Sequence, residues 1–443
     1  MLRVLSWSGQ TRRDWSPEDA GPFDLDEENQ KMAQTRRMFL TAACSVGVAA
    51  HAGLRGVAAT AVDRREDDRP TTKDDILTPA LLVDLDALEF NLQKMAEQCR
   101  RTGCSFRPHA KTHKCPEIAR LQIESGAVGV CVATVPEAEA MVAAGIAGVL
   151  LTSPIVEPGK VVRMVNLARK GAGVMLALGH RHEVELLSQA AGDQDVIVDV
   201  LVDVDVGDRR TGVPPGQHAL ELARRIDRAN NLRLQGLQAY AGFASHKKGF
   251  LSRRQVSQEC MAKAKAVETR DLFNRSGLNA SVLSGGSTGT YNIDSEIDGV
   301  TELQVGSYVV MDVGYRKIGG QGDDDLYADF KPSLTALTTV VSATYGDQVS
   351  VDAGGKAFAG SDRPEAIGWN GLTYDGFGDE FGRLTVQGDG KLPRLGDRLS
   401  LIVPHCDPTI SLYDRIYAVR GDKIEHIWPV AARREFQPIA PIG

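Results

Sequence analysis

An alternation of apolar, β-branched runs with helical segments begins near residue 76 and constrains the fold more than any other feature of the sequence. Such an alternation is typical of a parallel α/β protein. Apolar residues at helical spacing lie between the runs, for example over 136–144 and 215–229. Eight runs are predicted as strands: 105–109, 129–134, 149–153, 174–178, 196–206, 234–240, 281–284 and 302–310. Their number and order predict an α/β fold of the (β/α)8 TIM-barrel type over residues 76–325.

The pattern changes after residue 326, where short runs of strand character alternate with glycine turns. Five strands are predicted in this part: 334–344, 348–352, 384–387, 398–404 and 414–419. A C-terminal β domain is therefore expected over residues 326–443, which is within the usual size range of a domain. The segment 79–84 is expected to join this β domain or to bridge it to the barrel.

The composition of the chain restricts the kinds of partner that it is expected to bind. The chain has 443 residues, of which 42% are hydrophobic, so that it can bury a large core and form about two or three domains. A net charge of -7, with no block of lysine and arginine outside the N-terminal region, argues against nucleic acid and membrane partners. A small-molecule substrate is expected instead. The seven cysteines lack the spacing of a metal knuckle or a disulfide framework, and we expect them to be mostly reduced.

The N-terminal region carries a separate signal. Residues 1–34 are polar and are predicted to be disordered. The run 35–40 contains two adjacent arginines and precedes an apolar stretch that is too short to span a bilayer. This arrangement resembles a twin-arginine signal peptide, cleaved after Ala52 or Ala61, and predicts export to the periplasm. Residues 1–62 would then be a disordered extension plus a signal peptide, whereas a plain basic tail would leave the protein in the cytoplasm.

Polar residues cluster just after the predicted strand ends, which is the face that carries the active site in barrel enzymes. Lys111 follows the first strand and lies between His109 and His113. A lysine attacks carbonyl groups when burial or nearby positive charge lowers its pKa, and the two histidines are expected to act in this way. The same stretch is also typical of a solvated basic turn.

A glycine-rich run, 284–290, follows the seventh predicted strand. Barrels commonly bind a phosphate group there through backbone N–H groups, although glycine-rich runs are also ordinary turns. A phosphate site together with an imine-forming lysine indicates pyridoxal phosphate.

A possible metal site lies near the C-terminus. His405 and Asp407 are spaced to share one metal ion, although such a pair is also common in ordinary loops. If the segment is extended, the side chain of Cys406 points away from that ion.

The sequence also resembles a known family over residues 76–440. The motifs that carry this resemblance are 78–84, 107–114, 205–212, 238–240, 285–289 and 404–408. They are similar to those of the fold-type III pyridoxal phosphate enzymes, in the branch that holds D-threonine aldolase and D-serine dehydratase. The resemblance implies an alanine-racemase-type barrel, a following β domain and a homodimer with its active site between subunits.

The resemblance also implies roles for individual residues. Lys111 would hold the cofactor as a Schiff base, and His246 would be the general base. The remaining implied residues are Gly286, Ser287, Thr288 and Gly289 around the phosphate, Tyr308 as a further phosphate contact, Arg210 and Tyr240 beside the cofactor ring, and His405 and Asp407 as metal ligands.

The reaction expected from this resemblance depends on Asp407. Dehydratases of the branch typically carry His-x-Cys with zinc, whereas the aldolases carry His-x-Asp. A carboxylate oxygen favours a hard divalent ion, manganese first and magnesium next, over zinc. We therefore expect a lyase that cleaves D-3-hydroxy amino acids to glycine and an aldehyde. The alternatives are a dehydratase of D-serine or D-3-hydroxyaspartate and, beyond it, a racemase or a non-catalytic pyridoxal-phosphate-binding protein.

Overall fold

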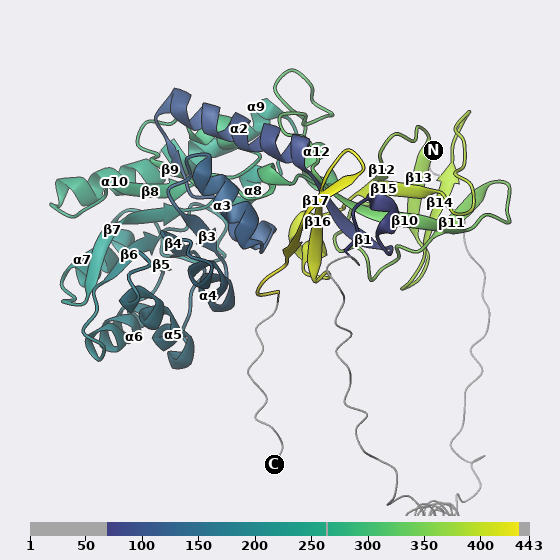
Figure 1. Cartoon of the computed structure of the whole chain (residues 1–443). Coiled ribbons are helices and arrows are strands. Elements are labelled where there is room, and N and C mark those ends of the chain that lie inside the picture. The colour runs from purple at the N-terminus through teal and green to yellow at the C-terminus, as the bar shows by residue number, and fades with distance from the viewer. Residues whose placement is uncertain (1–68, 263–264, 434–443) are drawn as a thin grey trace, which may run out of the picture. The chain divides into compact units, whose positions relative to one another are not determined.

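The computed structural model describes residues 69–262 and 265–433 (Figure 1). The extension and signal peptide predicted over residues 1–62 lie outside this part of the chain. The described residues from Pro70 onward form one compact unit, which contains a parallel sheet of eight strands and a second sheet of nine. Among the described helices, none combines the length and the apolar character needed to cross a membrane.

The parallel sheet forms the predicted barrel. Its strands are β2 (Ser105–Phe106), β3 (Val130–Val132), β4 (Val149–Leu151), β5 (Met175–Leu178), β6 (Val198–Asp203), β7 (Leu232–Ala239), β8 (Val282–Gly285) and β9 (Glu302–Leu303). They follow one another in the order β2-β9-β8-β7-β6-β5-β4-β3. A parallel bridge between His109 and Cys131 joins the two outer strands, β2 and β3, and closes the sheet. The prediction of a (β/α)8 barrel is confirmed.

Several strands are shorter than predicted because loop interactions replace the ladder hydrogen bonds. β6 ends at Asp203, and just beyond it the Asp205 carboxylate accepts hydrogen bonds from the N–H groups of Gly207 and Arg209 at 2.8 and 2.9 Å. The predicted strand 302–310 contains only β9, which is followed by the 3-10 helix η6 (Ser307–Val309). Such side-chain bonds to nearby N–H groups compete with regular structure.

The longer helices of the barrel lie on the outer side of its strands (Figure 1). They are α2 (Leu85–Thr102), α3 (Pro116–Glu124), α4 (Val135–Ala143), α5 (Pro158–Arg169), α6 (Arg181–Gly192), α7 (Gln217–Asp227), α9 (Phe250–Ser257) and α10 (Ala266–Arg275). The short helices α8 (Gly242–Ser245), α11 (Tyr291–Asp294) and α12 (Val313–Arg316) follow β7, β8 and β9. Capping explains where α4 begins, since the Thr134 side chain accepts from the Glu137 N–H while the Glu137 carboxylate accepts from Thr134 N–H.

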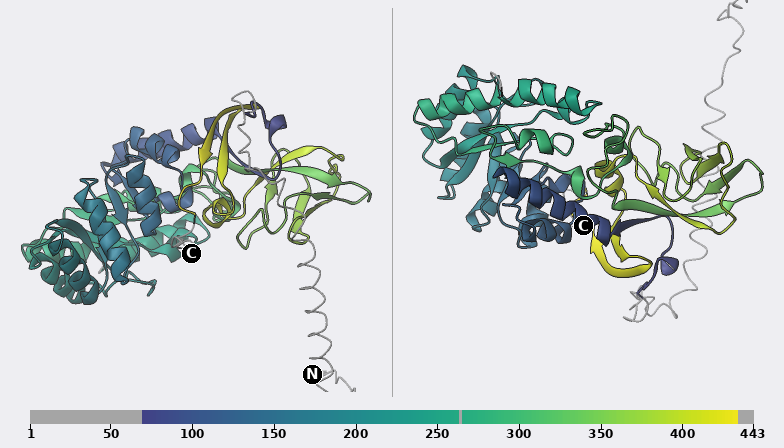
Figure 2. Two further views of the ribbon diagram at one scale, coloured as in Figure 1. Left: turned by 60° about the horizontal axis from the view of Figure 1, so that its bottom comes forward. Right: turned by 90° about the horizontal axis from the view of Figure 1, so that it is seen from above.

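The C-terminal part forms the second sheet. Its strands are β1 (Ala80–Asp84), β10 (Leu334–Ser342), β11 (Gln348–Val351), β12 (Glu365–Ala366), β13 (Leu372–Gly376), β14 (Gly382–Val386), β15 (Arg398–Ile402), β16 (Arg415–Arg420) and β17 (Lys423–Pro429). β1 pairs antiparallel with β10 and parallel with β16, so the segment 79–84 contributes to the β domain as predicted. Figure 2 shows the yellow strands β16 and β17 beside the purple β1 segment.

Three strands of this sheet, β12, β13 and β17, were not predicted. β12 has only two residues, and β17 exposes most of its side chains. Neither pattern stands out from a polar loop, because strand assignment from sequence depends on an alternation of apolar residues.

Candidate active site

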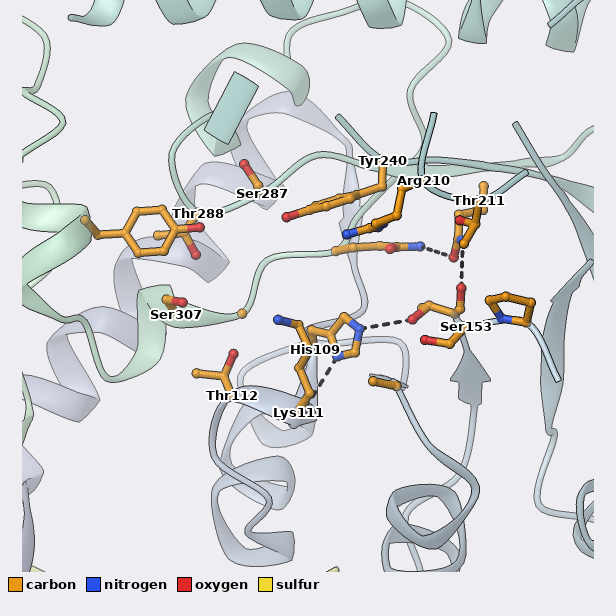
Figure 3. A pocket seen from close by; sticks show the side chains of 17 residues that line it. His109, Lys111, Thr112, Ser153, Arg210, Thr211, Tyr240, Ser287, Thr288 and Ser307 are labelled. Atoms are coloured by element: carbon orange, nitrogen blue, oxygen red, sulfur yellow. Dashed lines mark hydrogen bonds between the residues drawn. The ribbon is translucent and has the colours of Figure 1, made fainter. Parts of the chain in front are cut away.

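A cavity of about 340 Å³ opens where the barrel strands end. Seventeen residues line it, and they come from the segments that follow β2, β4, β6, β7, β8 and β9, among others. Figure 3 shows Lys111 and His109 on one wall and Arg210 and Tyr240 on the facing wall. The predicted site residues Lys111, Arg210, Tyr240, Ser287 and Thr288 all line this cavity.

Lys111 occupies the short 3-10 helix η4 (Ala110–Thr112), which directly follows β2. Its ammonium group forms an ion pair with the carboxylate of Asp407, and 42% of the Lys111 side chain remains exposed. Burial opposes the charge on Lys111, but Asp407 outweighs burial and raises the pKa of Lys111. The same pair lowers the pKa of Asp407 although burial alone would raise it.

The prediction that His109 and His113 lower the pKa of Lys111 is wrong, because both imidazoles are buried and neutral. Burial lowers the pKa of His113 to about 4 and that of His109 well below its ordinary value. His109 Nε2 lies 3.1 Å from the hydroxyl of Thr152, which donates its own proton to the Val132 carbonyl oxygen. His109 therefore donates to Thr152 and leaves Nδ1 to accept from the Lys111 N–H.

The glycine-rich loop after β8 has the geometry of an anion cradle. Gly286 has a φ of +73°, and a Cβ there would lie 2.9 Å from an Asp294 carboxylate oxygen. A Cβ on Gly289 would collide with the carbonyl oxygen of Ser245. Within the described residues, the N–H groups of Ser287, Thr288 and Gly289 donate to no protein acceptor. Successive unpaired N–H groups in a turn bind anions, so the loop fits a phosphate group.

Two side chains hold this loop from behind. The buried guanidinium of Arg253 on α9 donates to the Gly289 carbonyl at 2.9 Å, and the Tyr327 hydroxyl donates to the Thr288 carbonyl at 2.7 Å. The carbonyl oxygens are thus turned toward the protein. Figure 3 shows the side chains of Ser287 and Thr288 at the cavity.

The wall opposite Lys111 combines a cation and an aromatic ring. The Arg210 guanidinium lies 4.9 Å from the centroid of the Tyr240 ring. Contacts of this kind fix the orientation of both groups. A planar cofactor ring between this wall and Lys111 fits the cavity.

Of the metal ligands predicted at 405 and 407, Asp407 contacts Lys111, whereas His405 groups with Asp312 and Cys406. The backbone also differs from the prediction. His405 precedes the short helix α13 (Cys406–Ile410), so the expectation of an extended segment is wrong. The Cys406 thiol is fully buried, and it lies with a carboxylate oxygen of Asp312 and a ring nitrogen of His405 within 4.8 Å. Its side chain therefore lies toward this cluster and does not point away from it.

Asp312 was missed in the sequence. Its Oδ2 lies 2.9 Å from Nδ1 of His405 and accepts from the Cys406 N–H at 3.0 Å. With Nδ1 bound to Asp312, the Nε2 atom of His405 is left for a metal ion. The sequence held one available signal, since Asp312 directly follows the apolar residues 308–311 beyond the last barrel strand.

His246 and Tyr308 lie outside the set that lines the cavity, as do Gly286, Gly289, His405 and Asp407. The ring of His246, at the end of α8, lies 4.5 Å from the ring of Tyr315, which is a lining residue. Desolvation lowers the pKa of His246, although Asp312 acts in the opposite direction. The Tyr308 hydroxyl is buried and accepts from Gln122 at 3.2 Å, while the Tyr308 N–H donates to the Thr288 hydroxyl. The structure therefore gives Tyr308 contact with the loop through its backbone.

Comparisons with known proteins agree with this geometry. Residues 83–313 match the family described as "Alanine racemase, N-terminal domain", and residues 333–419 match "Putative serine dehydratase domain". The chain is 37% identical to D-threonine aldolase of Arthrobacter sp., over 80% of this chain and 92% of that protein. It is 36% identical to 3-hydroxy-D-aspartate aldolase of Paracoccus denitrificans (strain Pd 1222), over 81% and 92%.

A solved structure and a dehydratase complete the comparison. The crystal structure of D-threonine aldolase from Filomicrobium marinum superimposes with a TM-score of 0.77 at 34% identity, covering 82% of this chain and 98% of that one. D-threo-3-hydroxyaspartate dehydratase of Delftia sp. (strain HT23) is 30% identical over 60% of this chain and 67% of that protein.

Proposed function

The chain belongs to the fold-type III pyridoxal phosphate enzymes, in the group that contains D-threonine aldolase and 3-hydroxy-D-aspartate aldolase, and on this premise we propose its reaction. The protein is an aldehyde-lyase that cleaves D-3-hydroxy amino acids to glycine and an aldehyde. One observation carries the proposal above all, namely the contact of Lys111 with Asp407 at one cavity. It brings an amine that would bind the cofactor next to a carboxylate that would bind a metal ion.

Different residues around the cavity would bind different parts of the cofactor. Lys111 would bind it covalently, the N–H groups of Ser287, Thr288 and Gly289 would take its phosphate, and Arg210 would lie beside its ring. Bound pyridoxal phosphate supplies an electron sink for the carbanion that forms at Cα when the Cα–Cβ bond breaks.

The metal ligands would act on the β-hydroxyl of the substrate. A divalent cation lowers the pKa of the hydroxyl group that it binds. His405 and Asp407 are the proposed ligands, and Asp312 orients His405. The carboxylate ligand supports Mn²⁺, with Mg²⁺ and then Zn²⁺ as alternatives.

His246 is the proposed general base. Its lowered pKa keeps the imidazole neutral near pH 7, which is the state that can accept a proton. It would take the proton of the β-hydroxyl as Cα–Cβ cleavage proceeds. A residue in this role must lie near the metal ligands, and the charges of Asp312 and His405 both act on His246.

A dehydratase is the second candidate, because one dehydratase is also similar to this chain. Asp407 supports the aldolase, since an oxygen ligand holds a harder ion than a thiolate does. Incubation with D-threonine tests the choice. Glycine and acetaldehyde are expected, with no turnover of L-threonine, whereas ammonia and 2-oxobutanoate as main products would assign a dehydratase.

A further inference from the structure

A row of buried hydroxyl groups leads from the phosphate loop to a buried carboxyl group. The Ser287 hydroxyl lies 2.9 Å from the Thr290 hydroxyl, and either oxygen can be the donor. The Thr290 hydroxyl in turn contacts one carboxyl oxygen of Asp294, and the Ser257 hydroxyl of α9 contacts the other. All four residues are buried, with at most 4% of each exposed.

The direction of the hydrogen bonds in this row depends on whether Asp294 is protonated. Each hydroxyl has one proton to give, and an ionised carboxylate can only accept. When Asp294 is ionised, Thr290 donates to Asp294 and Ser287 donates to Thr290, so that Ser287 presents only lone pairs to the cavity. When Asp294 is protonated, the row reverses. Asp294 then donates to Thr290, Thr290 donates to Ser287, and the Ser287 proton is free to face the cavity.

Thr288, the neighbouring residue of the loop, lacks this dependence. Its hydroxyl oxygen accepts from the Tyr308 N–H at 2.9 Å, which leaves its own proton available whatever the state of Asp294. Of the hydroxyl groups of Ser287 and Thr288, only that of Ser287 is linked through this row to a carboxyl group.

We propose that Asp294 is a positioning residue, whose proton makes Ser287 a donor to the phosphate group of the cofactor. Binding of a phosphate monoester at this site is then accompanied by uptake of a proton at Asp294. This inference rests on the proposed function, in which the loop holds the phosphate of pyridoxal phosphate.

The surroundings of Asp294 allow the exchange of a proton near neutral pH. Burial raises the pKa of Asp294 to about 6, and donation from Ser257 and Thr290 opposes that shift. The titratable groups nearby are the thiols of Cys104 and Cys260, which burial keeps neutral. Leu303 of β9, which lies beside Gly286 together with Asp294, carries no charge. A bound phosphate adds negative charge and raises the pKa of Asp294 further.

The test measures binding of pyridoxine 5′-phosphate to the full chain freed of cofactor, between pH 6.5 and 8.5. This ligand lacks the aldehyde, so the pH dependence of imine formation does not enter. Wild type and Asp294→Asn are compared at each pH, because the phosphate of the ligand titrates near pH 6 in both experiments. The asparagine amide can donate to Thr290 at every pH.

We expect the affinity of wild type to fall about tenfold relative to Asp294→Asn over this range, in keeping with a proton linked to binding. The variant therefore binds more tightly than wild type at pH 8.5, which a purely structural role of Asp294 would not produce. In Ser257→Ala the fall moves to higher pH, since a donor that lowers the pKa of Asp294 is gone. Pyridoxine, which has no phosphate, should bind to wild type and to the variants with the same affinity.

Parallel pH curves for wild type and Asp294→Asn would overturn the inference and leave the proposed function intact. No binding of pyridoxine 5′-phosphate to wild type at any pH would overturn the cofactor assignment itself, and the inference with it. If thermal melting shows that Asp294→Asn is unfolded, Thr290→Val cuts the same row in its middle. Loss of the pH dependence in Thr290→Val supports the inference, and its persistence contradicts it.

Discussion

Lys111 and Asp407 are 296 positions apart in the chain and form an ion pair at the cavity. Lys111 follows the first barrel strand, whereas Asp407 belongs to a helix in the C-terminal part. Their contact raises the pKa of Lys111, so the lysine of the free protein carries a proton that must leave before the amine can attack a carbonyl group.

Replacing Lys111 with alanine tests the covalent attachment of the cofactor. Borohydride reduction of wild type should leave a pyridoxyl group on the peptide that contains Lys111, and Lys111→Ala should carry none. Cleavage of D-threonine should fall on the order of a thousandfold or more, as for other covalent catalytic groups. Lys248→Ala, at an exposed ion pair with Asp325, is the control and should keep both properties. A pyridoxyl group on another lysine of wild type would contradict the assignment.

Asp312→Asn tests the orientation of His405. The carboxylate holds Nδ1 of the imidazole, and loss of such a partner typically weakens metal binding about 10- to 100-fold. Competition with a chelating dye, on protein loaded with cofactor, gives the affinity for Mn²⁺ directly. Asp323→Asn, an exposed acid that contacts only backbone N–H groups and a neighbouring turn, should bind the metal as wild type does. Unchanged affinity in Asp312→Asn would mean that Asp312 does not act on the site.

Most of the candidate site could be predicted from sequence because its residues lie in short local motifs. Lys111, the loop 285–289 and His405 each stand in such a motif. Asp312 does not, and its contact with His405 joins residues 93 positions apart. The charge state of the two histidines near Lys111 could not be predicted from the sequence either, because it depends on burial and on partners such as Thr152.

At the scale of elements, the number and order of the barrel strands follow from local patterns, whereas only some of their ends do. β7 and β8 end within a residue of their predicted positions. The predicted strand 302–310 was too long, because the Tyr308 N–H pairs with the Thr288 hydroxyl instead of a neighbouring strand. Loop bonds of this kind form between segments distant in sequence, and no local periodicity encodes them.

The helix α9 has a defined task in holding three loops together. Its Arg253 is fully buried and donates to the carbonyl oxygens of Lys247, Gly289, Ile318 and Gly319. Gly289 belongs to the phosphate loop, whereas Lys247 follows α8 and the last two residues follow α12. The guanidinium therefore connects the phosphate loop to these two segments.

Arg253→Met should lower the free energy of unfolding by about 2–5 kcal/mol, because four buried carbonyl groups lose a charged donor. Urea denaturation followed by circular dichroism measures this change. Arg254→Met alters the next residue of the helix, which is exposed, and should change the stability by less than about 0.5 kcal/mol. Equal effects of the two substitutions would show that the loops do not depend on the buried guanidinium.

At the scale of the whole molecule, the largest hydrophobic cluster joins the barrel to part of the β domain, whereas β10, β11, β13, β14 and β15 enclose a smaller cluster of their own. The largest cluster of buried residues includes Leu88 and Phe106 of the barrel part together with Val403, Ile416 and Trp428 of the C-terminal part. β1, near the start of the described chain, is a strand of the C-terminal sheet. The predicted boundary at residue 326 therefore marks a change of sheet, and the largest cluster crosses it. The candidate site contains residues from both parts, because Lys111 follows β2 of the barrel and Asp407 lies in α13, which follows β15.

The assembly of the candidate site from distant parts of the chain is relevant to the proposed route of export. A site made from residues hundreds of positions apart exists only in the folded chain, so a cofactor bound there would be loaded after folding. The twin-arginine route carries folded proteins, so the paired Arg36 and Arg37 fit a protein that acquires its cofactor before it crosses the membrane. Replacing both arginines with lysine should leave the protein, with its cofactor, in the cytoplasm of the expressing cell. Fractionation followed by mass spectrometry of the N-terminus gives the location and the cleavage site, expected after Ala52 or Ala61. Wild-type protein that stays uncleaved in the cytoplasm would contradict export, and cleaved periplasmic protein from the double-lysine variant would contradict this route.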